Sequence, residues 1–580
     1  MTGAASSAGA RLIAPDRTRF RLWAPDLSEA ALEVEGRPPA PMSSCDDGWF
    51  EVEAEVGPGA AYRYCVGPDL VVPDPASRAQ DGDVNDASLV VDPESYRWRI
   101  DWSGRPWEEA VICEVHCGVL GGFAGVADYL PQLADLGVTA VQLMPVNDFS
   151  GRRNWGYDGV LPYAPDAAYG TPDELKALVD RAHELGMMIF LDVVYNHFGP
   201  DGNYLNAYAS RFFHPEKQTP WGAAIAFDRE PVARFFIDNA RYWVEEFRFD
   251  GLRFDAVHAI GDEAFLDRMA REVRDAAGPR QVHLILENEA NDAERLEQAY
   301  DAQWNDDFHN VMHVLLTGET SAYYQDFADD PEERLARCLA EGFIYQGEGS
   351  PNHEGAPRGK PSAQLRPAAF VSFLQNHDQV GNRAMGERLT SLVDHDRLKA
   401  AVAMQLLCPQ IPLIFMGEET GSTSPFLFFT DFHDELADAV REGRRREFAK
   451  FEAFADPEAR ERIPDPNAPS TFEMSRVRPG EDADGWRDLY RRLLKLRREM
   501  ITPGLAQAKS AGSQVLGDKA VAAAWTLGHG FRLSLALNLG SEAVAYADAP
   551  AAEPVFAVGD TATDGRIAPA CLLAWLEPVA

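Results

Sequence analysis

Residues 187–195 read MMIFLDVVY, an apolar β-branched run with one aspartate inside it, and residues 247–255 read FRFDGLRFD. Between them lies ARFFIDNARYWVEEF (233–247), where apolar residues recur at helical spacing. Strands whose two faces are both buried read as near-continuous apolar runs, and parallel strands need a helical crossover connection. The stretch therefore predicts two neighbouring parallel strands joined by a helix.

The same alternation continues on both sides. The predicted strands are VICEVH (111–116), VTAVQLMPV (138–146), MMIFLDVVY, FRFDGLRFD, VHLILE (282–287), DAQWND (301–306), AAFVSFLQN (368–376) and IPLIFMG (411–417). Eight such strands alternating with helices predict an α/β fold, a closed (β/α)8 TIM barrel.

Shorter strands flank the barrel. RFRLWAP (19–25), AALEVEG (30–36) and AYRYCVG (61–67) alternate apolar and polar residues between turns, which is typical of an antiparallel sandwich. We expect three domains: an N-terminal β-sandwich resembling carbohydrate-binding modules (1–100), the catalytic barrel with inserted loops (101–504) and a small C-terminal β domain (505–580).

The chain is strongly acidic. Its 580 residues include 54 Lys+Arg and 92 Asp+Glu, a formal net charge of −38. Nucleic acid and anionic membranes would be repelled, so a neutral ligand is favoured. Seven scattered cysteines without a CxxC pair, and no signal-peptide pattern in residues 1–16, favour a soluble cytoplasmic protein with reduced thiols.

Polar residues gather where the predicted strands end, and that edge of a barrel carries the active site. Arg253 and Asp255 are two apart on one strand, so their side chains leave the same face. A guanidinium beside a carboxylate favours its ionised form, which suits a nucleophile. Asp192, Asn196 and His197 end an earlier strand, and His377 and Asp378 a later one.

Glu287 ends an apolar strand, where burial raises a carboxyl pKa as a general acid requires. Glu289 shares its face and is the competing acid. Two carboxylates with opposite tendencies are typical of glycoside hydrolases, and a separation of about 5–5.5 Å would give retention of configuration. Four nearby aromatic residues offer flat faces to sugar rings: Trp155, Tyr157, Tyr195 and Trp221.

Each residue also has a purely structural interpretation. Asp192 could be a buried, hydrogen-bonded aspartate, Arg253 and Asp255 a structural ion pair, and the histidines and aromatic residues part of the core. Four strands placing polar residues at one end argue against all of these at once. No zinc, EF-hand, Rossmann or P-loop motif is present, so we expect no metal and no organic cofactor.

Four segments in order, DVVYNH (192–197), GLRFDAVH (251–258), ILE (285–287) and FLQNHD (373–378), resemble the signature regions of the α-amylase family of glycoside hydrolases. The resemblance implies that Asp255 is the nucleophile, Glu287 the acid/base and Asp378 the carboxylate that grips the distorted sugar. It also implies a set of substrate-binding residues: Arg253 (orienting Asp255), His197, His377, Tyr157, Trp155, Asp192, Asn196, His258 and Asp158.

Finer segments, among them EVHCGVL (114–120), NWGYDGVLPYAPDAAYGTPDEL (154–175) and QNHDQVGNRAMGERL (375–389), resemble one branch of that family. Its members cut the α-1,4 bond next to the trehalose end of maltooligosyltrehalose and release trehalose and a maltooligosaccharide. The resemblance implies maltooligosyltrehalose synthase as the metabolic partner. The segment WGAAIAFD (221–228) departs from the branch, with Ala223 and Ala226 where polar residues are usual, and EVHCGVL departs at Cys117 and Val119.

Two other functions fit the sequence. A glycogen branching or debranching enzyme would share the barrel and the carboxylates. A non-catalytic glycan-binding protein with a relic barrel would be expected to have lost the nucleophile or the acid, whereas all three carboxylates are present.

Overall fold

A closed barrel of eight parallel strands forms the centre of the molecule in the computed structural model, which describes residues 8–449, 452–454, 456–560 and 565–579. Its strands are β10 (Ile112–Val115), β11 (Ala140–Leu143), β14 (Met188–Val193), β17 (Gly251–Phe254), β18 (His283–Leu286), β19 (Ala302–Trp304), β20 (Phe370–Ser372) and β21 (Ile411–Phe415). Each lies within one of the eight predicted runs, and β10 closes the ring by pairing with β21. The predicted TIM barrel is confirmed.

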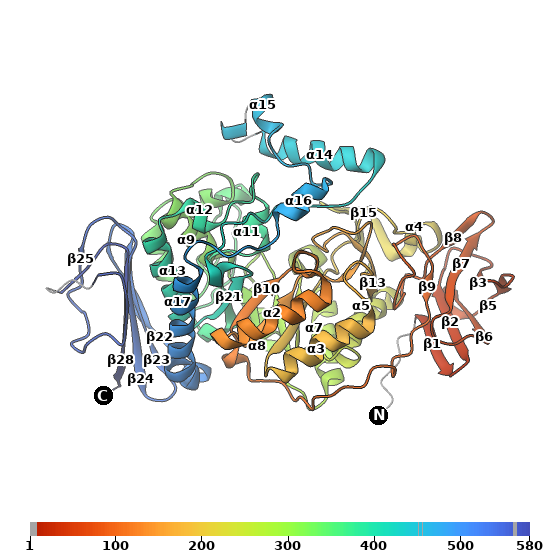
Figure 1. Cartoon of the computed structure of the whole chain (residues 1–580), viewed down its shortest axis with the longest axis horizontal. Helices are drawn as coiled ribbons and strands as arrows, with labels where there is room; N and C mark the ends of the chain where they lie inside the picture. The colour runs from red at the N-terminus through yellow and green to blue at the C-terminus, as the bar shows by residue number, and fades with distance from the viewer. Residues whose placement is uncertain (1–7, 450–451, 455, 561–564, 580) are drawn as a thin grey trace.

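Helices cover the outside of the barrel (Figure 1). They include α3 (Pro172–Glu184), α5 (Glu230–Glu245), α7 (Glu263–Ala277) and α13 (His395–Leu407). In α3, the Thr171 hydroxyl accepts from the Glu174 N–H while the Glu174 carboxylate accepts from the Thr171 N–H. This capping box fixes where the helix begins, after β13 (Gly159–Pro165), the strand that follows the loop of Trp155 and Tyr157.

The N-terminal region is a β-sandwich at one end of the molecule (Figure 1). One sheet contains β1 (Gly9–Ala14), β2 (Arg17–Trp23), β6 (Trp49–Ala54) and β5 (Ser43–Ser44). The other contains β4 (Ala40–Pro41), β3 (Ala31–Val34), β7 (Ala61–Gly67) and β8 (Leu70–Val72), with β9 (Ser88–Leu89) paired to β7. Alternate residues of β2 and β3 are buried, as the sequence pattern predicts.

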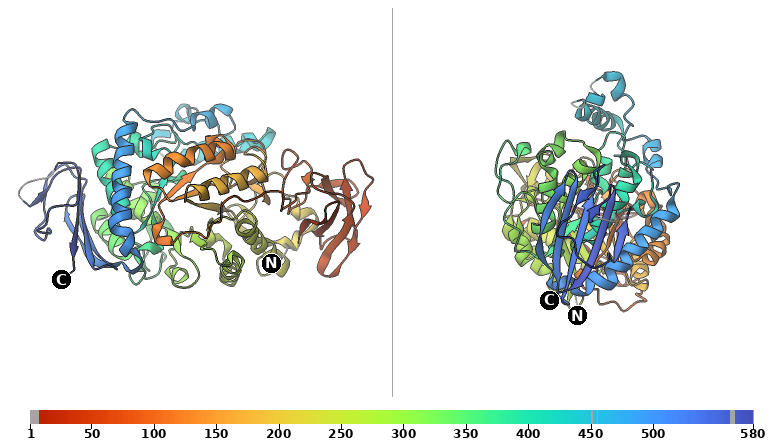
Figure 2. Two further views of the ribbon diagram at one scale, coloured as in Figure 1. Left: turned by 60° about the horizontal axis from the view of Figure 1, so that its bottom comes forward. Right: turned by 90° about the vertical axis from the view of Figure 1, so that its left-hand side faces the viewer.

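A five-stranded antiparallel sheet occupies the opposite end (Figures 1 and 2). Its order is β22 (Lys509–Gly517), β23 (Ala520–Leu527), β24 (Phe531–Asn538), β28 (Cys571–Pro578) and β26 (Phe556–Val558). The helix α17 (Ala483–Leu496) leads into it and packs against α13. The domain boundaries at residues 100 and 504 stay predictions, and residues 1–7, 561–564 and 580 of the outer domains lie outside the described part.

Several insertions lie beyond the carboxyl ends of the strands. Two are hairpins, β12 (Asn147–Phe149) with β13 (Gly159–Pro165) and β15 (Phe213–Thr219) with β16 (Gly222–Ile225). The third, which we call the arm, comprises α14 (Asp434–Phe448), α15 (Pro457–Arg460) and α16 (Pro469–Met474), and α14 and α15 project from the body in Figure 1. In the described residues, no helix is both long and apolar enough for a membrane span, and all seven cysteines are free thiols.

Candidate active site

Arg253 and Asp255 extend from β17 toward the carboxyl end of the barrel. The buried Arg253 guanidinium donates through Nη1 to Asp255 Oδ1 at 2.7 Å and to Asp192 Oδ2 at 2.7 Å. The Asp255 side chain keeps 13% of its surface open. Asp192 and Arg253 have no exposed side-chain surface, and they support Asp255 from below.

Glu287 follows the neighbouring strand β18 and faces the same guanidinium. Its Oε2 lies 3.8 Å from Arg253 Nη2 and accepts the Ala256 N–H at 2.6 Å. Ala256 has a positive φ of 42°, a strained conformation that turns its N–H toward Glu287. Burial raises the pKa of Glu287 to about 8, and the charge of Asp255 adds to the shift while Arg253 opposes it. A pKa raised in this way favours the protonated carboxyl, the form that a general acid needs, and the acid role of Glu287 stays a prediction.

The competing acid Glu289 lies at the rim. Its side chain is 56% exposed, against 18% for Glu287. The His353 ring lies 3.5 Å from its carboxylate and the His258 ring 3.9 Å. His258, predicted to bind substrate, thus lies beside Glu289 at the edge of the site, and burial lowers its pKa.

Asp378 and His377 begin the short helix α11 (His377–Gly381), which follows β20. The Asn376 side chain accepts the Asp378 N–H and caps the helix. Asp378 is 43% exposed at the side chain and lies 3.4 Å from His377 Nε2, while His377 Nδ1 lies 2.7 Å from Glu114 Oε1. Burial alone would lower the pKa of His377, but Asp378 and Glu114 outweigh it and raise the pKa to about 9.

Tyr157 connects two of these groups. Its hydroxyl donates to Asp192 Oδ2 at 2.7 Å, and its ring stacks on His377 with centroids 4.9 Å apart. His197 donates through Nε2 to the Tyr157 carbonyl at 2.9 Å, and its ring stacks on Trp221, which is 46% exposed, with centroids 5.1 Å apart. The Trp221 hairpin, with its Ala223 departure, therefore borders the predicted site.

The remaining predicted residues lie behind this surface. Asn196 is buried and contacts His197 Nδ1 at 3.0 Å, and Asp158 accepts from Asn154 at 2.8 Å. Burial raises the pKa of Asp158. Trp155 is buried with its edge toward His377 and donates to the Leu427 carbonyl.

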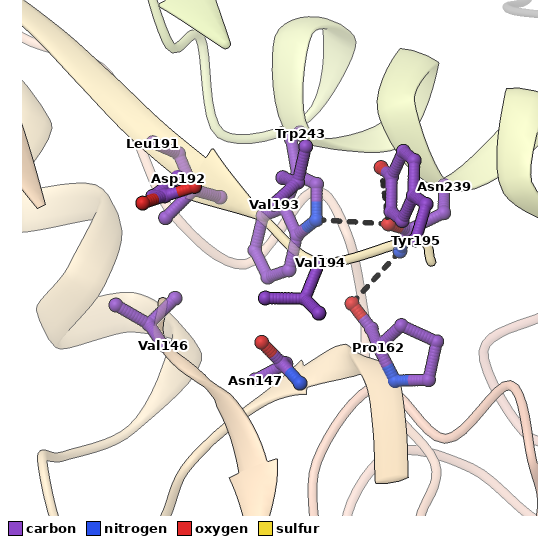
Figure 3. Close-up of a pocket in the computed structure, with 10 residues that line it drawn as sticks. All are labelled: Val146, Asn147, Pro162, Leu191, Asp192, Val193, Val194, Tyr195, Asn239 and Trp243. Atoms are coloured by element: carbon purple, nitrogen blue, oxygen red, sulfur yellow. Dashed lines mark hydrogen bonds between the residues drawn. The ribbon is translucent and has the colours of Figure 1, made fainter. Parts of the chain in front are cut away.

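Tyr195 is not a sugar platform, although its position in sequence suggested one. It is buried, and its hydroxyl donates to Asn239, which also bonds Trp243 and the Pro162 carbonyl (Figure 3). These groups line a small cavity behind Asp192 together with apolar side chains. The alternation of strand residues carries Tyr195 to the outer side of the barrel wall, where it packs on Phe236.

Two further carboxylates belong to the site and were missed. Asp306, directly after β19, receives a weak contact from Gln379 Nε2 at 3.5 Å, and burial raises its pKa to about 7. Its charge in turn raises the pKa of Glu287. Glu114 on β10 is fully buried under His377. Both positions follow the same strand-end pattern as Asp192 and Asp255, in DAQWND and VICEVH, so the signal was present.

The site offers carboxylates without a metal cage. Within the described ranges, no group of three or more His, Cys, Asp or Glu side chains is placed to hold a metal ion. The carboxylates instead share cationic partners, chiefly Arg253 and His377. Such an arrangement, with a partly exposed carboxyl paired to an arginine and a neighbouring carboxyl of raised pKa on the adjacent strand, supports acid/base and nucleophilic chemistry at an acetal.

Known proteins share this chain's sequence along most of its length. It is 40% identical over 500 residues to a malto-oligosyltrehalose trehalohydrolase of Deinococcus radiodurans, covering 83% of this chain and 81% of that protein. It is 39% identical to one from Saccharolobus solfataricus, covering 83% and 86%. The chain belongs to the malto-oligosyltrehalose trehalohydrolase family. It is an α-amylase-family glycoside hydrolase, and residues 77–221 match the model of the α-amylase catalytic domain.

Structural comparison agrees. A crystal structure of a putative alpha amylase from Salmonella typhimurium superposes with a TM-score of 0.93 at 46% identity, covering 99% of this chain and 100% of that one. Residues 508–575 match a domain of unknown function, DUF3459. A 1,4-alpha-glucan branching enzyme from Burkholderia thailandensis is 32% identical over 276 residues, only 42% of this chain and 33% of that enzyme. The branching enzyme is thus similar to less than half of this chain, whereas the trehalohydrolases are similar to most of it.

Proposed function

We propose that this enzyme hydrolyses the α-1,4-glucosidic bond next to the trehalose end of maltooligosyltrehalose, with retention of configuration. The observation that carries the proposal is the shared guanidinium: Asp255 and Glu287, from adjacent strands, both face Arg253. Similarity to trehalohydrolases over 83% of the chain supports the choice of substrate.

In the first step, an Asp255 oxygen attacks the anomeric carbon of the sugar before the scissile bond. The electrons of that bond pass to the glycosidic oxygen, which takes the proton from Glu287, and trehalose leaves. Asp378, open to the pocket, would hold hydroxyls of the distorted ring.

In the second step, Glu287, now ionised, takes a proton from water, and the hydroxide oxygen attacks the same anomeric carbon. The bond to Asp255 breaks, which restores its carboxylate and releases the maltooligosaccharide with its original configuration. His377, Tyr157 and His197 line this side of the pocket as polar contacts for the ring.

The substrate is a neutral oligosaccharide, in keeping with an acidic chain that would repel anions. We further propose that maltooligosyltrehalose synthase supplies it and that both enzymes work in the cytoplasm. The N-terminal sandwich (1–100) would then act as a carbohydrate-binding-like module beside the catalytic barrel (101–504), with the C-terminal β domain (505–580) at its other end.

The test is product analysis by chromatography after incubation with maltotriosyltrehalose, maltopentaose and amylopectin in parallel. We expect trehalose and maltotriose from the first, slow cleavage of the second and no change in the α-1,6 branches of the third. Loss or gain of branches without trehalose release would favour a debranching or branching enzyme. Binding of all three without turnover would favour a glycan-binding protein.

A further inference from the structure

The buried side chain of Arg444 is one of the contacts between the arm and the catalytic end of the barrel. Arg444 of α14 donates through Nη2 to the Gly381 carbonyl at 2.6 Å and to the Arg383 carbonyl at 3.2 Å. Its guanidinium lies over the rings of Phe428, at 5.3 Å, and Phe448, at 4.7 Å. A planar cation with two carbonyl acceptors and two aromatic faces is fixed in direction as well as in place.

The acceptor of the shorter bond ends the helix that carries Asp378. Gly381 is the last residue of α11, and the next N–H, of Asn382, donates to the Asp378 carbonyl at 2.8 Å. The Asn382 amide also donates to Asp378 Oδ1 at 3.3 Å. With the Asn376 cap at its start and Arg444 at its end, this short helix is held at both termini.

A second path runs through aromatic rings. Phe428, under Arg444, meets Trp155 edge to face at 5.2 Å, and Trp155 meets His377 in the same way at 5.6 Å. Trp155 also packs on Gly381 so closely that a Cβ there would lie 2.0 Å from its ring. Arg444 therefore bears on both sides of α11, through its backbone and through the rings beneath it.

We propose that Arg444 is a positioning residue for Asp378 and His377, so that the arm, remote in sequence from the signature regions, sets the geometry of the transition-state site. The inference rests on the proposed function. Asp378 would contact the sugar most strongly in its distorted form, so misplacing it lowers kcat more than it raises KM.

The experiment compares Arg444→Ala and Arg444→Lys with Arg446→Ala, a matched control on the exposed side of the same helix. Assayed on maltotriosyltrehalose well below each Tm, Arg444→Ala should lose about 10- to 100-fold in kcat. Lysine should recover part of that loss, because it keeps the charge and one donor to the Gly381 carbonyl. Arg446→Ala should match wild type.

A structural role is separated by repeating Arg444→Ala in an Asp378→Asn background. If Arg444 acts through Asp378, Arg444→Ala should lower kcat only a little further in the Asp378→Asn background. If Arg444 only stabilises the fold, Arg444→Ala should lower kcat by the same factor in both backgrounds, and the inference is overturned. Wild-type kcat in Arg444→Ala also overturns it. Should the alanine variant not fold, Arg444→Lys is carried through the same cycle. Absence of trehalose release by wild type would instead defeat the proposed function itself.

Discussion

The strand β17 has an aspartate at each end, and the two are held in opposite ways. At the amino end, Asp250 is fully buried and accepts from the Trp102 indole at 2.7 Å, from a backbone N–H of β14 at 2.9 Å, and meets His183 at 2.9 Å. At the carboxyl end, Asp255 bonds Arg253 through one oxygen and keeps part of its side chain open.

The difference shows how one barrel separates stability from catalysis. At the amino end, partners from three segments surround Asp250, so its bonding capacity serves the fold. At the carboxyl end, Arg253 holds Asp255 through one oxygen and part of the Asp255 side chain stays exposed, while Asp255 and Asp378 both lie near enough to Glu287 to raise its pKa. A buried carboxyl whose oxygens are all hydrogen-bonded, such as Asp250, supports the fold, whereas a carboxyl with an exposed part, such as Asp255, can contact a substrate.

Replacement of Asp255 by asparagine should give the largest effect, since the nucleophile is lost while the shape remains. We expect kcat on maltotriosyltrehalose to fall by at least about 10⁴-fold, with Tm close to wild type. Chromatographic measurement of released trehalose checks kcat, and thermal unfolding checks Tm. Substantial residual activity would break the comparison at its catalytic end.

The matched change at the other end is Asp250→Asn. It leaves one buried donor or acceptor without its partner, at a cost of about 1–3 kcal/mol in the free energy of unfolding. The kcat of the folded enzyme should stay near wild type. If kcat falls as far as in Asp255→Asn, the two ends of β17 are not functionally distinct.

Glu287→Gln and Glu289→Gln sharpen the comparison along the next strand. We expect about 10²- to 10⁴-fold loss of kcat for the buried Glu287 and little change for the exposed Glu289. A substrate with fluoride as leaving group needs no proton for departure, so α-maltotriosyl fluoride should restore much of the first step in Glu287→Gln. Equal losses for both variants on maltotriosyltrehalose would contradict the assignment of the acid.

Asp306→Asn should have a smaller effect, seen in the pH profile. Burial raises the pKa of Glu287 to about 8, and the Asp306 charge contributes to that shift. As the acid, Glu287 must be protonated, so kcat/KM falls as pH rises through its pKa. Removing the Asp306 charge lowers the pKa of Glu287, and this alkaline decline should move to lower pH. The control is Glu289→Gln, and an unmoved profile in Asp306→Asn would contradict the coupling.

The last expected effect concerns how stability depends on pH. Unfolded Glu has a pKa of about 4.3, whereas folded Glu287 titrates near 8. Between these values the folded state alone holds the proton, so the contribution of Glu287 to stability is full below the lower pKa and is lost as pH rises through the upper one. Glu287→Gln lacks this loss, and its Tm should rise relative to wild type between pH 5.5 and pH 9. If the difference in Tm between Glu287→Gln and wild type stays constant across this pH range, the raised pKa of Glu287 is contradicted.

The barrel was readable from the sequence because each strand is a buried apolar run of the right length. The carboxylates were readable because strand ends converge at one edge, whatever the loops do. Contacts between residues far apart in the sequence could not be predicted. His377 contacts Glu114, 263 residues away, and the Gly381 carbonyl accepts from Arg444 of the arm, 63 residues away. The position of Tyr195 was readable and was missed: it lies three residues after Asp192, so strand alternation puts the two side chains on opposite faces, and Tyr195 packs on Phe236 outside the barrel.

The Arg253 guanidinium lies close to three acidic groups, so a change in the charge of one of them during the reaction affects the protonation of another. Arg253 contacts Asp192 and Asp255 directly and stands near Glu287. When the glycosyl ester forms, Asp255 ceases to be an anion, and the repulsion that kept the proton on Glu287 weakens while the cation's attraction for its carboxylate is less divided. On the proposed mechanism, Glu287 is thus an acid before the ester forms and a base afterwards. The placement of Asp255 and Glu287 around Arg253 therefore couples the change in Glu287 to the formation of the ester.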